Sequence, residues 1–154
     1  MDQSVEMPVR QAGVIYLKNQ VITNWAEKDP SLNQSSQLLY TIHEQDRGMI
    51  RESIVDAVVL SPDLIRVHLA VCINHIVRHD FPHKWTGIVD KIVVYLQSPN
   101  LSGWLGALVS LYQLVKNFEY KTHQERTPLV EALQLILPLV YQCLAHLMPD
   151  PSEH

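Results

Sequence analysis

Hydrophobic residues recur at intervals of three and four along almost the whole chain, which predicts a protein built from α-helices. Turn-forming pairs such as Ser61-Pro62 and Ser98-Pro99 separate neighbouring segments, because proline disfavours the helical conformation of the residue before it. We therefore predict an all-α fold with helices over 8–26, 44–60, 62–79, 84–98, 101–118 and 127–148.

The first predicted helix begins at Pro8 and carries one apolar stripe. Proline is well tolerated at a first helical position, because its missing N–H would have no partner there. The stripe consists of Val9, Ala12, Gly13, Tyr16, Leu17 and Val21. We expect residues 1–7 to form a short leader that cannot cover this stripe.

The spacing of the helices indicates how they are arranged. The first helices of consecutive pairs start near residues 8, 62 and 101, and the second helices start near residues 44, 84 and 127. Three of the four intervals are about 40 residues, which is typical of HEAT and armadillo repeats. The polar connection 27–43 accounts for the longer interval. The spacing favours a HEAT-repeat α-solenoid of about three stacked antiparallel helix pairs over 8–148, with a globular helical bundle as the alternative.

The composition fits a folded domain and argues against nucleic acid or a membrane as partner. The chain has 154 residues, of which 47% are hydrophobic, and its 12 basic and 16 acidic side chains give a net charge of −4. No cluster of Lys and Arg is present that would bind a phosphate backbone. The apolar run 132–147 is interrupted by Gln134, Pro138, Gln142 and His146. No stretch therefore has the length and purity of a membrane span, and we expect no membrane insertion. The N-terminus lacks a signal-peptide pattern, which favours the cytoplasm or the nucleus.

Few residues suggest catalysis or cofactor binding. Both cysteines lie within apolar helical patterns, so we expect buried, reduced thiols. His75, His79 and His83 have the spacing of metal ligands on a helix, but Pro82 should end the helix between them. The five glycines form no phosphate-binding loop. We therefore expect no enzyme, no cofactor and no metal site.

Four blocks of the sequence share their order and their separations with one known family. They are PVRQAGVIYLKN, DRGMIRESIVDAVVLSPDLIRVHL, HDFPHKWTGIVDKIVVYLQS and SGWLGALVSLYQLVKNFEYK. In these blocks the chain resembles the N-terminal region of importin-β superfamily nuclear transport receptors, in the importin seven and importin eight branch. The resemblance extends over about residues 8–139. It implies a HEAT-repeat superhelix whose N-terminal arch binds the GTP-bound form of the small GTPase Ran.

The resemblance also implies which residues face this partner. In this family the second helix of each pair lines the inner face, which here means 44–60, 84–98 and 127–148. The candidates for the Ran-facing surface are charged residues that lie away from the apolar stripes: Asp46, Arg47, Arg51, Glu52, Asp90 and Lys91. A surface of mixed sign suits a protein partner that is guided electrostatically. The alternative is that these residues form ordinary solvated helix faces.

The chain departs from the family pattern at both ends. Receptors of this family begin with a helix pair before the PVRQ-like helix and continue through many more repeats, whereas here a leader, 1–7, and a tail, 149–154, are expected. We therefore expect protein cargo and nucleoporins as partners only where later repeats are present. The expected function is part of an importin that shuttles between cytoplasm and nucleus and passes the nuclear envelope at the pore. A truncated product without transport activity is the alternative.

Overall fold

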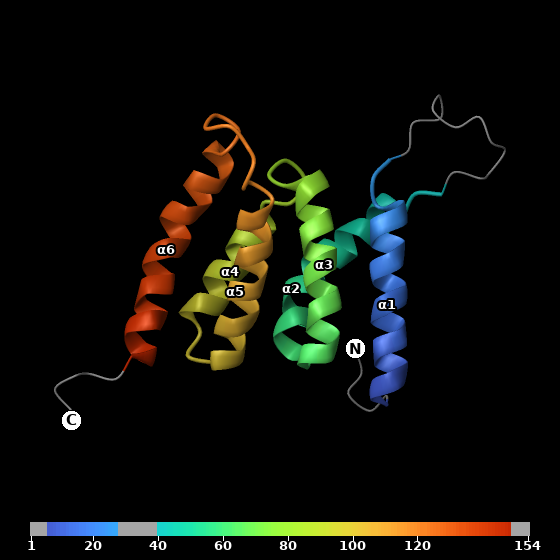
Figure 1. Cartoon of the computed structure of the whole chain (residues 1–154), viewed down its shortest axis with the longest axis horizontal. Coiled ribbons are helices and arrows are strands. Elements are labelled where there is room, and N and C mark those ends of the chain that lie inside the picture. Colours follow the sequence, from blue (N-terminus) through green and yellow to red (C-terminus); the bar gives the residue numbers. More distant parts are fainter. Residues whose placement is uncertain (1–5, 28–39, 149–154) are drawn as a thin grey trace.

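The computed structural model describes residues 6–27 and 40–148, and this part of the chain consists of helices and their connections (Figure 1). The helices are α1 (Met7–Asn24), α2 (Glu44–Leu60), α3 (Asp63–Asp80), α4 (Gly87–Gln97), α5 (Leu101–Lys116) and α6 (Thr127–Leu147). The prediction of an all-α fold is confirmed. Residues 1–5 of the expected leader and all of the expected tail lie outside the described residues.

The helices stack in two layers along the molecule. Helices α1, α3 and α5 contact one another in succession, and α2, α4 and α6 do the same in the other layer. The layers meet where α2 contacts α3 and α5, and where α5 contacts α4 and α6. Figure 1 shows the resulting progression from α1 at one end to α6 at the other. Each helix therefore packs mainly on its neighbours in the stack, as expected for a HEAT-type solenoid.

Short turns create the consecutive pairs that pack directly, α2 with α3 and α4 with α5. Ser61 and Pro62 separate the first pair, and Asn100 caps the second by accepting a hydrogen bond from the backbone N–H of Ser102 at 2.9 Å. Among the described helices, α1 does not pack on α2, and α3 does not pack on α4. Of the pairs that the helix starts suggested, α5 contacts α6, whereas the longer connections 25–43 and 81–86 separate α1 from α2 and α3 from α4.

The predicted apolar stripes of the central helices form the core. On α3 every residue of this stripe is buried: Ile65, Leu69, Cys72, Ile73 and Ile76. Both cysteines are buried and free, as the sequence predicted. Burial raises the pKa of the Cys72 thiol to about 11. Cys72 therefore acts as a small hydrophobic residue of the core.

Helix α5 approaches its neighbours closely because two of its residues lack a side chain. A Cβ atom on Gly106 would lie 2.4 Å from Cγ2 of Val59 and 3.0 Å from the Cα atom of the same residue. A Cβ atom on Gly103 would lie 3.3 Å from Cδ1 of Tyr95. The two glycines therefore set the distance of α5 from α2 and α4.

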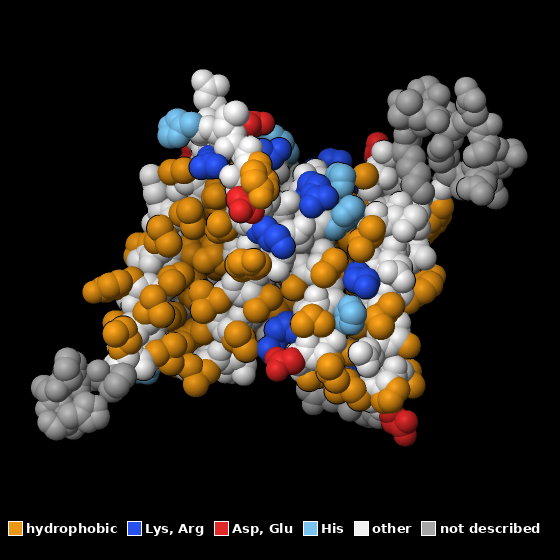
Figure 2. All heavy atoms as spheres, in the orientation of Figure 1, with side chains coloured by type: hydrophobic (Ala, Val, Ile, Leu, Met, Phe, Trp, Pro, Cys, Tyr) orange, Lys and Arg blue, Asp and Glu red, His pale blue; other side chains and the backbone are white. Residues whose placement is uncertain are grey.

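The helices at the two ends expose much of their apolar surface. On α1, Val14 and Val21 are buried, whereas four residues of the predicted stripe are exposed: Val9, Ala12, Gly13 and Tyr16. Hydrophobic side chains also gather over α5 and α6 in Figure 2. The exposed apolar residues of α6 include Leu135, Leu137, Tyr141, Leu144 and Leu147. Apolar faces of this extent are typical of interaction surfaces.

By length and composition alone, α6 could cross a membrane. The mean hydropathy of its most apolar window is 1.5, and 22% of that window is buried. The expectation that no segment is long and apolar enough therefore needs correction, because the many leucines outweigh the four interrupting residues. One such helix is a weak indication of membrane insertion, since helices in the core of soluble proteins meet the same criterion. In this fold α6 packs against α4.

Candidate functional site

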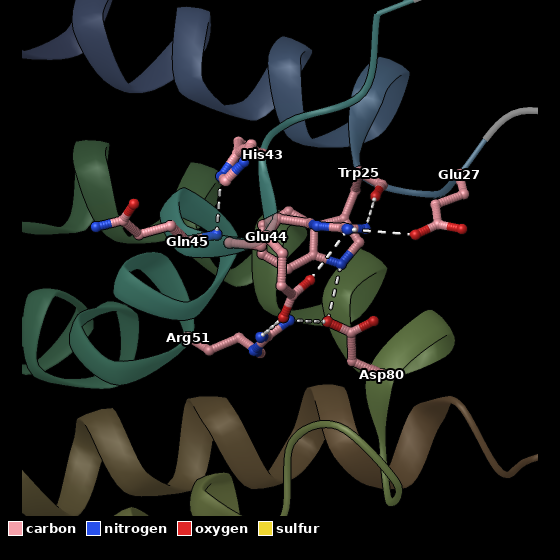
Figure 3. A network of polar contacts seen from close by, with 8 residues as sticks. Trp25, Glu27, His43, Glu44, Gln45, Arg51 and Asp80 are labelled. Atoms are coloured by element: carbon pink, nitrogen blue, oxygen red, sulfur yellow. Dashed lines mark hydrogen bonds and ion pairs between the residues drawn. The ribbon is translucent and has the colours of Figure 1, made fainter.

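A polar network joins the end of α1 to α2 and to the end of α3 (Figure 3). Its centre is the buried carboxylate of Asp80, whose Oδ2 accepts hydrogen bonds from Nε1 of Trp25 at 3.0 Å and from Nη1 of Arg51 at 2.8 Å. Arg51 also pairs with Glu44. The guanidinium carbon of Arg51 lies 5.9 Å from the centre of the Trp25 ring, within reach of a cation–π contact. The network therefore holds the Arg51 side chain in one orientation.

Arg47 is buried in this network, with 6% of its surface exposed. Its Nη1 donates to the backbone carbonyl of Trp25 at 2.9 Å, and its Nη2 lies 3.0 Å from Glu44 and 3.6 Å from Glu27. The expectation that Arg47 faces away from the core is wrong. The guanidinium of Arg47 donates to a backbone carbonyl at the end of α1. The helical periodicity of α2 cannot reveal such a distant acceptor.

The first turn of α2 is organised around a carboxylate. Hydrogen bonding to Arg51 lowers the pKa of Glu44 from its ordinary value of 4.5. Glu44 is also the first residue of α2, where a negative charge interacts favourably with the helix dipole. His43 precedes it and accepts a hydrogen bond from the backbone N–H of Gln45 at 3.3 Å (Figure 3). The start of α2 is therefore fixed from both the backbone and the side chains.

An open groove of about 600 Å³ lies next to the network, between α2 and the start of α4. We call it the α2–α4 groove, and its lining residues are Gly48, Arg51, Glu52, Lys84, Trp85, Thr86, Gly87 and Lys91. Lys91 pairs with Asp56 at 2.6 Å. Lys84 forms no ion pair within the part of the chain that the structure describes. The groove therefore combines three cations and one carboxylate, and one of the cations is unpaired.

The groove borders a turn where the sequence predicted a helix. The backbone N–H groups of Lys84 and Trp85 both donate to the carbonyl of Asp80, at 2.7 Å and 3.0 Å. Helix α4 consequently begins at Gly87 and not at residue 84. Trp85 is buried under this turn, and Lys84 is exposed. The same residue, Asp80, thus positions Arg51 through its side chain and Lys84 through its backbone.

The carboxylate of Asp56 holds the far side of the groove. It accepts hydrogen bonds from Lys91 at 2.6 Å and from the hydroxyl of Tyr95. Burial, together with the hydrogen bond to Asp56, raises the pKa of Tyr95 to about 12. Tyr95 therefore stays protonated and keeps Asp56 in place for Lys91.

The structure brings three of the six candidate residues together. Arg51, Glu52 and Lys91 line the α2–α4 groove, whereas Asp46 and Asp90 are exposed beside it and do not line it. The sixth candidate, Arg47, is buried. Lys84 was not among the predicted site residues, because the sequence pattern placed it in a helix. The nearby FPHKWTG segment, which carries a proline and a glycine within seven residues, could have indicated a turn.

The histidines of α3 do not form a shared site. The rings of His75 and His79 have centres 4.7 Å apart, and His83 lies beyond the end of the helix. Within residues 6–27 and 40–148, no group of His, Cys, Asp and Glu is arranged to hold a metal ion.

Comparisons with known proteins relate the sequence of this chain to importins. Residues 1–59 match the family model described as Importin-beta N-terminal domain. The chain is 50% identical to Importin-8 of Mus musculus over 150 residues, or 97% of its length. It is 49% identical to Importin-8 of Danio rerio over 152 residues, or 99% of its length. It is 30% identical to the probable importin-7 homolog of Dictyostelium discoideum over 152 residues, or 97% of its length.

The chain spans only a small part of these relatives. It covers 15% of the two Importin-8 proteins and 13% of the Dictyostelium protein. Importins are transport receptors without enzymatic activity, in agreement with the sequence-based expectation that this chain is not an enzyme. Residues 1–59 therefore form an Importin-beta N-terminal domain, and nearly the whole chain is similar to a part of Importin-8.

Proposed function

We propose that this chain supplies the Ran-binding surface of a nuclear import receptor, and that the α2–α4 groove and its charged neighbours contact the GTP-bound form of Ran. Family membership carries the proposal, because the Importin-beta N-terminal domain is associated with Ran binding. The location of the groove supports it. The groove lies in the layer of α2, α4 and α6, and the resemblance assigns these helices to the inner face of the solenoid.

Preorganisation of the charged residues also supports a protein-binding role. Arg51 is held by Asp80 and Glu44, and Lys91 is held by Asp56. Side chains that are already ordered lose little conformational entropy when a partner binds. Charged groups of both signs, including Asp46, would guide the encounter and fix its register.

The proposed mechanism is a coupling between two binding events. A receptor that takes up cargo in one compartment and binds GTP-Ran in the other needs each ligand to weaken binding of the other. In this proposal the repeats over 8–148 carry the Ran half of that coupling. Protein cargo and nucleoporins would bind in a chain that contains later repeats, and such a receptor would shuttle between cytoplasm and nucleus.

The test is retention of Ran by the purified full chain. Circular dichroism and size-exclusion chromatography first establish that the chain is helical and monodisperse. The immobilised chain is then offered Ran loaded with a non-hydrolysable GTP analogue or with GDP, and we expect it to retain the GTP form selectively. A folded, monodisperse chain that retains neither form at high micromolar concentration would contradict the proposal. That result would support the alternative, a product without transport activity.

A further inference from the structure

We infer that the α2–α4 groove receives an acidic segment of the protein partner, and that Lys84 pairs with a carboxylate of that segment. The inference rests on the proposed function and adds the chemistry by which the partner is recognised. Three features meet in the groove: an unpaired lysine, two ordered cations with unused hydrogen-bond donors, and two glycines that keep the groove open.

The charges of the groove favour a carboxylate ligand. Arg51 uses one hydrogen bond to Asp80 and one to Glu44, although a guanidinium has five N–H donors. Lys91 uses one of the three ammonium donors for Asp56. The charge of Lys84 acts on Glu44 only at longer range, as part of what lowers the Glu44 pKa. Cationic donors thus remain available along the groove, and charge-assisted hydrogen bonds to carboxylates are the strongest they can form.

The glycines of the groove have no role in the fold that the structure reveals. A Cβ atom on Gly48 would have Nη2 of Arg51 as its nearest neighbour, at 3.8 Å, and a Cβ atom on Gly87 would meet nothing within 4 Å. Neither residue has a positive φ angle. Gly48 lies inside α2, where glycine disfavours the helix relative to alanine. Open space beside a helical glycine is what close approach of a partner would require.

Packing gives a clear contrast within the same protein. A Cβ atom on Gly106 would lie 2.4 Å from Val59, so α5 needs glycine there in order to pack on α2. Gly48 has no such neighbour. The two helical glycines therefore differ in what excludes a side chain. At Gly106 the neighbouring helix α2 excludes it, and at Gly48 the bound partner does.

Glu52 sets the direction in which the acidic segment lies. Among the described residues that line the groove it is the one carboxylate, and it is exposed. Like charges repel, so the segment should place its carboxylate nearer to Lys84 than to Glu52. This arrangement predicts opposite effects of removing the two charges.

The first experiment measures the affinity of the full chain for GTP-Ran at low and at physiological salt. We expect Lys84→Glu to weaken binding about tenfold, more strongly at low salt, and Glu52→Gln to strengthen it a few-fold. Lys121→Glu is the matched control, because Lys121 is also an exposed lysine and lies in the α5–α6 connection, outside the groove. Equal effects of the two lysine variants, or none, would overturn the inference.

The second experiment fills the groove without changing its charge. We expect Gly48→Leu to weaken GTP-Ran binding at least tenfold, while its thermal midpoint stays at or above that of the wild type, because leucine favours the helix. Weaker binding together with an unchanged or higher thermal midpoint would show that the groove is blocked and that the variant is not misfolded. Unchanged binding by folded Gly48→Leu would mean that nothing enters the groove.

A third measurement tests whether the groove binds an acidic ligand when Ran is absent. Hexaglutamate is titrated into the full chain and followed by tryptophan fluorescence, with Trp85→Phe to assign the change to the groove, whose lining includes Trp85. If the wild type retains no Ran, the proposed function fails, but hexaglutamate binding that Lys84→Glu abolishes would still support an acidic ligand. Absence of both Ran and hexaglutamate binding would overturn the inference as well.

Discussion

At the scale of single residues, Asp80 is the connecting point of the described structure. Its carboxylate binds Trp25 at the C-terminal end of α1 and Arg51 of α2. Its backbone carbonyl binds the turn before α4. Buried ionic groups of this kind often add little net stability, because their desolvation offsets their attraction. They do, however, fix relative positions when all their partners are present. Asp80 therefore defines how α1, α2 and α3 are placed at this edge of the solenoid.

Loss of the Asp80 carboxylate should be strongly destabilising. Asp80→Ala leaves the guanidinium of Arg51 and the indole N–H of Trp25 without a common acceptor, and we expect the free energy of unfolding to fall by about 3 kcal/mol. Urea unfolding followed by circular dichroism measures this free energy. Asp63→Ala is the control, because Asp63 pairs with Arg66 at the surface and its loss should cost less than about 1 kcal/mol. Similar losses in both variants would show that the network is not stabilising.

The Glu44 carboxylate should make stability depend on acid pH. Hydrogen bonding to Arg51 lowers its folded-state pKa below the ordinary 4.5, so the folded state binds fewer protons than the unfolded state near that pH. The stabilisation is therefore present above about pH 4.5 and is lost as the pH falls through the lowered folded-state pKa. Glu44 is largely exposed, so less than about 1 kcal/mol is expected.

Thermal midpoints of the wild type and of Glu44→Gln from pH 3 to pH 7 test this effect. The difference between the two proteins should be constant above pH 5 and should shrink in acid. A difference that does not change with pH would mean that the pairing with Arg51 does not depend on ionisation of Glu44.

Single residues also show where prediction from sequence stops. The stripe of α3 was predicted residue by residue, because helical periodicity reports directly on which face is buried. Arg47 was placed on the wrong side, since its acceptor is a carbonyl of Trp25, 22 residues earlier in the chain. Lys84 was missed for a related reason: its environment depends on how α3 ends. Contacts between distant segments leave no periodic pattern.

At the scale of helices, two glycines make a matched pair for testing packing. Gly106→Ala places a methyl group against Val59 of α2, and we expect the free energy of unfolding to fall by about 2 kcal/mol. Gly48→Ala places a methyl group in open space within a helix, and we expect a gain of about 0.5 to 1 kcal/mol. Chemical denaturation of the two variants measures both values. Effects of the same sign would show that helix propensity, and not contact between α5 and α2, decides the outcome at both positions.

Helix ends were the least predictable feature at this scale. The bounds of α2 agree with the predicted 44–60, because Ser61-Pro62 marks its end in the sequence and the polar connection precedes its start. The start of α4 was placed three residues too early, because Trp85 fits the apolar spacing of the helix while the N–H groups of Lys84 and Trp85 turn back to the carbonyl of Asp80. Periodicity therefore identified the helices, and local hydrogen bonding decided where they begin.

At the scale of the whole molecule, the exposed apolar faces of the end helices should control solution behaviour. We expect the chain to self-associate at tens of micromolar through α6, because the exposed residues Leu137 and Tyr141 lie one turn apart on this helix. The double variant Leu137→Glu/Tyr141→Glu should shift the measured mass towards the 17.7 kDa of the monomer. Size-exclusion chromatography with light scattering gives this mass.

Tyr120→Glu is the control for that experiment. Tyr120 is 93% exposed but lies in the connection between α5 and α6, outside the apolar face of α6. Its substitution should leave the mass unchanged. If Tyr120→Glu lowers the mass as much as the double variant does, then general charge repulsion and not the α6 face is responsible.

The way in which α1 is attached also determines how the molecule moves. Among the described helices α1 contacts α3 alone, and its polar contacts to the rest of the chain lie at its C-terminal end, where Trp25 meets Asp80 and the carbonyl of Asn24 accepts the N–H of Ile42. The polar contacts of α1 hold its C-terminal end, and its first turn, where Pro8 and Val9 are exposed, should open more easily. Amide hydrogens of the first turns of α1 should therefore exchange with deuterium long before those near Val21. Helix α1 would then open from its N-terminal end towards Trp25.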